Sequence, residues 1–131
     1  GYAVPSAIGA ALAEPGRPVL CLVGDGGLGM TVAELETIAR LDLPITVVVF
    51  NDSALSLIKI KQRDGHGESE VVSYRETDFA AVARGFGMDA VRVTEPGALR
   101  SALSHGWHGP RLLDVAVDPA SYPHLMAITR G

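Results

Sequence analysis

The chain has 131 residues, 47% of them hydrophobic and 20% charged, so it can bury the core of one domain and is too apolar to be disordered. Its net charge of −4 argues against a nucleic-acid surface, and its apolar runs are far shorter than the roughly 20 residues of a membrane span. A single cysteine, Cys21, excludes an internal disulfide and a cysteine metal cluster. We expect one domain over residues 1–131, in a cytoplasmic setting.

The first half of the chain predicts a helix, a strand, a helix and a second strand. Small residues over 6–13, with Ser6 as a cap, predict a short, closely packed helix. The apolar run at 19–23 is bounded by proline and glycine and predicts a strand buried on both faces. Apolar residues recur at helical spacing over 31–40, and the β-branched run at 45–50 predicts another buried strand. Strand, helix and strand in this order form a parallel βαβ unit.

The second half continues the alternation of helices and strands. Residues 53–63 predict a short helix, and 64–70 have the composition of an exposed loop, which we interpret as a candidate lid. Thr77 and Asp78 are placed to cap a following helix. The remaining predicted elements are that helix through Arg84, a strand over 89–93, a helix over 98–105 and a strand over 112–117. The whole pattern indicates an α/β fold with a mainly parallel sheet.

Two acidic residues, Asp25 and Asp52, follow the ends of the two strands of the βαβ unit. Because the carboxyl ends of parallel strands meet at one edge of a sheet, we expect the two strand ends to lie at most two strand spacings apart, at about 4.8 Å each. Gly26, Gly27 and Gly29 let the backbone approach a bulky anion closely. Oxygen ligands beside such a backbone favour Mg²⁺ with a phosphate group. The alternative is a simple Asp-Gly turn that binds nothing.

The spacing of two short motifs favours the binding site over the simple turn. Gly-Asp-Gly-Gly at 24–27 is followed roughly 25 residues later by Asn-Asp at 51–52. This pair resembles the Gly-Asp-Gly…Asn-Asn signature of thiamine-diphosphate-dependent enzymes. Residues 1–11, 34–37 and 78–87 also resemble segments of these enzymes. The resemblance covers nearly the whole chain, and the family includes pyruvate decarboxylase, benzoylformate decarboxylase and acetolactate synthase.

The resemblance implies a Rossmann-like, three-layer α/β/α domain that binds the diphosphate of thiamine diphosphate through Mg²⁺. By position, Asp25 would be the first metal ligand, Asp52 the second and the main-chain carbonyl of Ala54 the third. The residues that the resemblance places at the cofactor are Gly24, Asp25, Gly26, Gly27, Asn51, Asp52, Ala54 and Leu55. The family carries an asparagine where this chain has Asp52, and a register shift of one residue would make Asn51 the ligand. A second carboxylate would hold Mg²⁺ more tightly but leave less positive charge for the diphosphate.

The same resemblance implies that this chain is a piece of a longer enzyme, in which the cofactor carries the chemistry on a small 2-oxo acid. The glutamate that activates the cofactor would lie on a separate pyrimidine-binding domain, usually of a neighbouring subunit in a homodimer or homotetramer. No catalytic residue is expected in this chain, so alone it would bind the cofactor weakly and be inactive. Residues 51–62 resemble acetolactate-synthase-like proteins more than simple decarboxylases. The alternatives are a non-catalytic or regulatory module of the same fold, or another enzyme class on a parallel sheet.

Four further polar residues have two interpretations each. Lys59, Lys61 and Arg63 form either a contact for a substrate carboxylate or a solvated basic helix face, and the second is the commoner role. His66 is either a proton donor on its glycine-rich loop or an exposed side chain. The sequence leaves their roles open.

Overall fold

The computed structural model describes residues 1–63, 70–104 and 108–124. Within them, four strands form one sheet in the order β1-β2-β4-β3. The strands are β1 (Val19–Gly24), β2 (Ile45–Asn51), β3 (Asp89–Val93) and β4 (Arg111–Ala116). Every pairing is parallel, because consecutive strands are joined by helical crossovers rather than hairpins. The expected α/β fold with a parallel sheet is confirmed.

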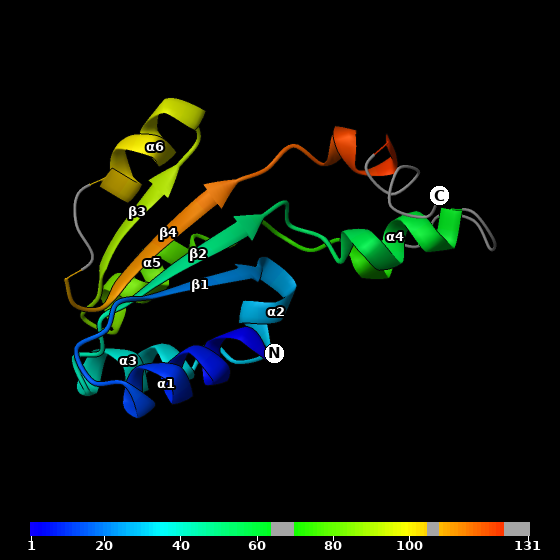
Figure 1. Cartoon of the computed structure of the whole chain (residues 1–131). Coiled ribbons are helices and arrows are strands. Elements are labelled where there is room, and N and C mark those ends of the chain that lie inside the picture. The colour runs from blue at the N-terminus through cyan, green and yellow to red at the C-terminus, as the bar shows by residue number, and fades with distance from the viewer. Residues whose placement is uncertain (64–69, 105–107, 125–131) are drawn as a thin grey trace.

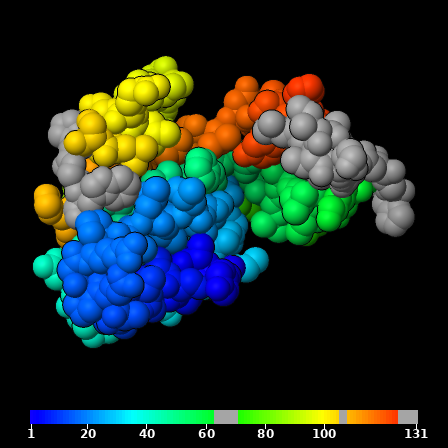
Figure 2. Space-filling view, viewed as in Figure 1, coloured from blue at the N-terminus to red at the C-terminus, as the bar shows by residue number. Residues whose placement is uncertain are grey.

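Helices cover the sheet on both sides and give three layers (Figure 1). α1 (Ala3–Ala13), α3 (Glu34–Arg40) and α5 (Phe79–Gly85) pack on one face, and α6 (Pro96–Ser104) packs on the other. α4 (Ser56–Arg63) lies beyond the carboxyl ends of the strands. In the space-filling view, α4 (green) stands at the opposite end of the molecule from α6 (yellow) (Figure 2). No helix among the described residues is long and apolar enough to cross a membrane.

Several helices begin at other residues than the sequence predicts. α1 starts at Ala3 rather than at residue 6, because the proline in its first turn needs no amide partner. Residues 31–33 form a turn, so α3 starts at Glu34. α4 starts at Ser56 rather than at residue 53, because Ser53 has a left-handed backbone with φ of 58°.

Three short helical segments were not expected from the sequence. They are α2 (Asp25–Gly29), η1 (Glu70–Val72) and η2 (Pro119–Ser121). The glycines of the first motif hid α2, since glycine is a poor helix former. The predicted cap of α5 is confirmed, because the Asp78 carboxylate accepts a 2.7 Å hydrogen bond from the Ala81 amide.

The prediction that β1 is buried on both faces was wrong. Cys21 and Val23 point into the core, whereas Leu20 and Leu22 are 46% and 54% exposed. β1 is an edge strand of the described sheet, while α6 packs on β3 and β4 at the other side. An apolar run therefore does not show by itself that both faces of a strand are covered. β2 lies inside the sheet and is buried on both faces, as predicted.

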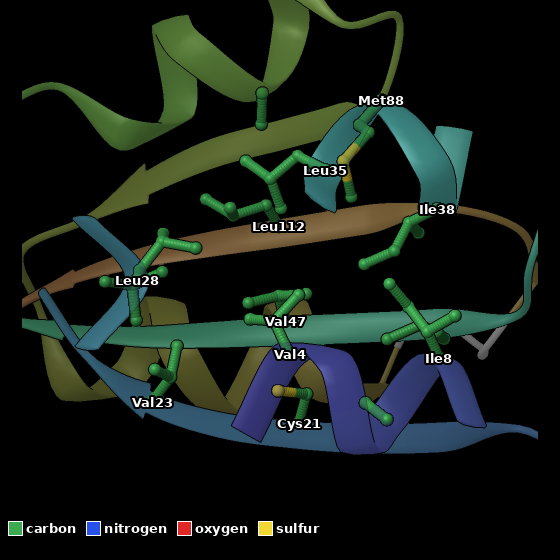
Figure 3. Packing of buried hydrophobic residues seen from close by; sticks show 14 of the residues in the cluster. Val4, Ile8, Cys21, Val23, Leu28, Leu35, Ile38, Val47, Met88 and Leu112 are labelled. Carbon is green, nitrogen blue, oxygen red and sulfur yellow. The ribbon is translucent and has the colours of Figure 1, made fainter. Parts of the chain in front are cut away.

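The main core fills the space between the sheet and the layer of α1, α3 and α5 (Figure 3). Val4 and Ile8 from α1 lie over Cys21 and Val47 of the first two strands. Cys21 is 4% exposed, so its thiol is part of this core. Full burial of an aliphatic side chain stabilises a fold by about 1.5–3 kcal/mol, so this cluster fixes β1 against β2.

The register of β1 and β2 places the two sequence motifs together. Val23 pairs with Val49 and Gly24 pairs with Phe50, so the two strands are direct neighbours and end at the same edge of the sheet. Asp25 and Asp52 therefore follow adjacent strand ends. This meets the prediction of two strand spacings or fewer.

Candidate functional site

The side chain of Asp25 lies at the first residue of α2 and is 4% exposed. One carboxylate oxygen, Oδ1, accepts a 2.7 Å hydrogen bond from the amide of Gly26. The other, Oδ2, accepts hydrogen bonds from the amides of Ser53 at 2.7 Å and Asp52 at 3.2 Å. A buried carboxylate needs such donors to offset the loss of water. These bonds tie the end of β1 to the loop that follows β2.

The loop after β2 makes a sharp bend at Ser53, a non-glycine residue with φ of 58°. Residues held in this conformation cost about 1 kcal/mol or more and are concentrated at functional sites. Asp52 precedes the bend, and its carboxylate accepts hydrogen bonds from two residues that follow it. The donors are the Ala54 amide at 3.1 Å and the Ser56 hydroxyl at 2.5 Å. The bend points successive main-chain amides at the carboxylate of Asp25.

Residues 72–74 pair with this loop through a short antiparallel bridge. The Leu55 amide donates to the Val72 carbonyl at 2.8 Å, and the Tyr74 amide donates to the Ser53 carbonyl at 3.1 Å. In such a pairing the main-chain groups of the residue between, Ala54, point away from the partner segment. The carbonyl of Ala54 accepts no hydrogen bond from any residue that the structure describes. It is therefore free to serve as an oxygen ligand.

Asn51, the last residue of β2, directs its side chain into the protein. Its amide group donates to Oδ1 of Asp114 at 3.0 Å and to the Thr77 carbonyl at 2.9 Å. Its side-chain oxygen faces Ser53 at 3.3 and 3.4 Å. The side chain of Asn51 thus supports the loop from the protein interior, whereas the side chain of Asp52 lines a hollow at the surface.

Two tyrosines that were not predicted from the sequence reach the carboxylates. Burial raises the pKa of the Tyr74 phenol, and a hydrogen bond to Asp25 and the charges of Asp25 and Asp52 raise it further. Burial also raises the pKa of Tyr122, followed by the charge of Asp52 and a hydrogen bond to it. Neither tyrosine belongs to a motif that could have pointed to it.

A cavity of about 510 Å³ opens beside Asp25. It is lined by Asp25, Gly26, Gly29, Met30, Val32, Leu55, Tyr74, Thr77, Phe79 and Val82. A Cβ atom added at Gly26 would lie 2.6 Å from Cδ2 of Leu55 and 3.4 Å from the hydroxyl of Tyr74. A smaller hollow of about 130 Å³ lies beside Asp52, on the side of the loop that faces away from Asp25. Its lining residues are Asp52, Ala54, Ser56, Lys59, Ile60, Pro119, Tyr122 and Pro123.

This arrangement agrees with what comparison with known proteins shows. A family model described as the C-terminal TPP binding domain of thiamine pyrophosphate enzymes matches residues 1–115. The chain belongs to this family. Thiamine pyrophosphate is another name for thiamine diphosphate, so the resemblance drawn from the two motifs is confirmed.

Relatives with similar sequences carry the name acetolactate synthase. The chain is 38% identical over 120 residues to acetolactate synthase of Bacillus subtilis (strain 168), a match that covers 90% of this chain and 21% of the relative. It is 30% identical over 138 aligned positions to acetolactate synthase isozyme 3 large subunit of Escherichia coli (strain K12), covering 100% of this chain and 24% of that relative. The chain thus spans about a fifth to a quarter of the length of these relatives.

A solved structure has the same fold. The thiamine diphosphate-dependent 4-hydroxybenzoylformate decarboxylase of Rhodococcus jostii RHA1 matches with a TM-score of 0.79 and 25% sequence identity. The match covers 89% of this chain and 23% of that chain. Together with the layers described above, it confirms the Rossmann-like α/β/α fold of this thiamine-diphosphate-binding domain.

An ion pair between the buried Asp114 and the partly exposed Arg92 supports the loop after β2. Asp114 is 0% exposed and accepts hydrogen bonds from the Arg92 side chain at 2.8 Å, the Phe79 amide at 3.0 Å and the side chain of Asn51. Burial lowers the pKa of Arg92, but the hydrogen bond to Asp114 and the charges of Asp114 and the nearby acids outweigh burial and raise it overall. Arg92 also pairs with the exposed Glu76. No sequence motif pointed to this network.

The remaining polar candidates fall in different places. Lys59 donates a 3.0 Å hydrogen bond to the Ser73 hydroxyl and lines the smaller hollow beside Asp52. Lys61 is exposed, which agrees with a solvated position. His66 and residues 64–69 of the predicted loop lie outside the described residues. The structure describes only the backbone of Arg63 and of residue 70.

Proposed function

We propose that this domain binds the diphosphate of thiamine diphosphate through Mg²⁺, as part of a 2-oxo acid decarboxylase or carboligase of the acetolactate-synthase type. The observation that carries the proposal is that three oxygen donors follow adjacent strand ends. They are the carboxylates of Asp25 and Asp52 and the main-chain carbonyl of Ala54. The cofactor, when bound, supplies the electron sink for chemistry at a 2-oxo group.

The donor set fits Mg²⁺. This ion takes hard oxygen ligands at about 2.0–2.1 Å, with few of them from the protein and the rest from phosphate and water. Asp25 is held in place by three amides, and the Ala54 carbonyl has no partner among the described residues, so both are prepared as ligands. Asp52 would complete the protein's share after a small rotation away from Ser56.

The same geometry favours Asp52 over Asn51 as the second ligand. The side chain of Asn51 is buried, and its amide group is held by Asp114 and the Thr77 carbonyl. Its oxygen, the atom that would bind a metal, already accepts hydrogen bonds from Ser53. Asp52 instead lines a hollow at the surface. Asn51 would then act on the cofactor indirectly, by holding the loop that carries Asp52.

The main chain around Gly26 would hold the diphosphate. A Cβ at Gly26 would displace the side chain of Leu55, so the glycine leaves the backbone open to a close approach by a bulky anion. Gly24 and Gly27 flank Gly26 in the chain and Leu55 lines the same cavity, so these three residues are assigned to the cofactor with it. Lys59, in the hollow with Asp52, supplies a positive charge that would offset the second carboxylate.

The activity of the whole enzyme would need the parts of its relatives that this chain does not span. We infer a pyrimidine-binding domain, usually from a neighbouring subunit of a homodimer or homotetramer in the cytoplasm, and a small 2-oxo acid as substrate. This chain alone would bind the cofactor weakly and be inactive. The acetolactate synthases among its relatives favour carboligation over simple decarboxylation.

The test is a calorimetric titration of thiamine diphosphate, with and without Mg²⁺, into this chain and into the longest natural polypeptide that carries it. Asp25→Asn is compared with Asp42→Asn, a matched change at an exposed residue whose left-handed φ of 46° asparagine tolerates. We expect Mg²⁺-dependent binding that Asp25→Asn abolishes and Asp42→Asn preserves. Absence of binding in both wild-type polypeptides would contradict the proposal and favour a non-catalytic module.

A further inference from the structure

Tyr74 places a hydroxyl group at the point where the diphosphate would meet the main chain. It lines the larger cavity together with Asp25 and Gly26. A Cβ atom at Gly26 would lie 3.4 Å from the Tyr74 hydroxyl, so the phenol stands directly over the glycine backbone. A donor in this position can reach an anion that rests on Gly26 from the side of the cavity.

The main chain fixes this position. The Tyr74 amide is bonded to the carbonyl of Ser53, within the loop that carries both Asp52 and Ala54. The neighbouring Ser73 accepts a hydrogen bond from Lys59 of α4, which adds a second tie. Tyr74 is thus attached to the same loop as the candidate metal ligands, and its phenol ring is the part left to rotate.

The hydrogen-bond capacity of Asp25 limits which acceptors are open to the hydroxyl of Tyr74. An ionised carboxylate has about four acceptor positions. Main-chain amides fill three of them on Asp25, and Tyr74 lines the cavity beside the same carboxylate, whose charge helps to raise the pKa of its phenol. A cation on Asp25 needs the remaining position, so the hydroxyl must then donate to another acceptor. The oxygens of a diphosphate on the adjacent Gly26 are the acceptors within its reach.

We propose that Tyr74 is a diphosphate-positioning residue, whose hydroxyl donates to a phosphate oxygen when the metal and the diphosphate are bound. The inference rests on the proposed function and adds a residue to it. It also assigns a role to the short pairing between residues 53–55 and 72–74, which carries the donor to the cavity.

The experiment compares Tyr74→Phe with the wild type by calorimetry, both in the longest natural polypeptide that carries this chain. Three probes are titrated: thiamine diphosphate with Mg²⁺, inorganic pyrophosphate with Mg²⁺, and Mg²⁺ alone. Tyr2→Phe is the matched control, because Tyr2 is 85% exposed and lines neither hollow. Loss of a hydrogen bond to a charged group weakens binding by about tenfold or more. We expect that loss for both diphosphate probes in Tyr74→Phe, no loss for Mg²⁺ alone, and no change in Tyr2→Phe.

The other outcomes separate the two proposals. Equal binding of both diphosphate probes to Tyr74→Phe and to the wild type would overturn the role of Tyr74 and leave the proposed function standing. Weaker binding of Mg²⁺ alone, by the same factor, would reduce Tyr74 to a support of Asp25 and also overturn it. Failure of the wild type to bind thiamine diphosphate would reject the proposed function, and the role of Tyr74 with it.

Discussion

Asp25 and Ser53 are joined by a 2.7 Å hydrogen bond from the Ser53 amide to the Asp25 carboxylate, across 28 positions of sequence. The bond makes Asp25 part of the fold as well as a candidate metal ligand, because it holds the bend that carries Asp52 and Ala54. Removing the carboxylate should therefore have two separable effects, one on stability and one on binding.

The stability effect depends on what replaces Asp25. Alanine would leave the amides of Gly26, Asp52 and Ser53 without their acceptor, and buried unsatisfied donors cost about 1–3 kcal/mol each. Asparagine keeps one acceptor oxygen. We expect Asp25→Ala to lower the free energy of unfolding by about 2–4 kcal/mol and Asp25→Asn by less than half of that, measured by urea denaturation. Equal losses would show that the amide bonds do not support the loop.

Asp52→Asn tests the departure from the family motif. Asparagine keeps the acceptor for the Ala54 amide but removes one negative charge from the metal site. We expect Mg²⁺ to bind several-fold more weakly, while thiamine diphosphate still binds once Mg²⁺ is saturating. The measurement is the Mg²⁺ dependence of thiamine diphosphate binding. An unchanged Mg²⁺ requirement would remove Asp52 from the metal site.

The pair of Asp114 and Arg92 should be among the most sensitive positions of the domain. Asp114→Ala would leave the buried donors of Asn51 and Phe79 without their acceptor, at about 1–3 kcal/mol each, while Arg92 would keep Glu76 as a partner. We expect a loss of about 2–5 kcal/mol by urea denaturation. Glu76→Ala is the control. Its side chain is 68% exposed, so the loss should stay below about 1 kcal/mol.

Gly26→Ala should separate binding from folding. The added Cβ would meet Cδ2 of Leu55 at 2.6 Å, the flexible end of a side chain that can move into the cavity. We expect a stability loss of about 1 kcal/mol or less and a loss of cofactor affinity of about tenfold or more. Gly97→Ala is the control, because Gly97 lies in α6, lines neither hollow, and an added Cβ there meets nothing within 4 Å. It should bind the cofactor like the wild type, and equal effects of both variants would contradict this assignment of Gly26.

Cys21 should make the domain less stable in alkaline solution. Burial raises the pKa of its thiol above the ordinary value of 9.0. The folded state therefore keeps a proton that the unfolded chain releases, so this contribution is complete below pH 9 and is lost as the pH rises through the folded-state pKa. Urea denaturation between pH 8 and pH 10, compared with Cys21→Ala, measures it. An identical pH dependence in both proteins would contradict the burial of the thiol.

The fold was largely predictable because local patterns carry it. The β-branched run of β2 and the helical spacing before it gave the βαβ unit, and Asp78 gave the start of α5. Local patterns do not show which elements cover each face of a strand, so the exposed face of β1 at Leu20 and Leu22 was not predicted. Backbone bends such as that at Ser53 were missed as well, since serine carries no signal for a left-handed conformation.

The candidate site was predictable only as far as its motifs reach. Asp25 and Asp52 follow strands whose pairing the sequence implied, and the structure brings them to one edge. Tyr74, Tyr122 and Asp114 join the site from distant parts of the chain. No spacing rule links them to the motifs, because their positions follow from tertiary packing alone.

The central claim is that Asp25, Asp52 and Ala54 share one cation with the diphosphate of thiamine diphosphate. Anomalous diffraction from crystals grown with Mn²⁺ in place of Mg²⁺, together with the cofactor, tests it directly. The account predicts one Mn²⁺ at about 2 Å from both carboxylates and from the Ala54 carbonyl, bridged to phosphate oxygens. A bound cofactor with its metal elsewhere, or with Asn51 in place of Asp52, would contradict it.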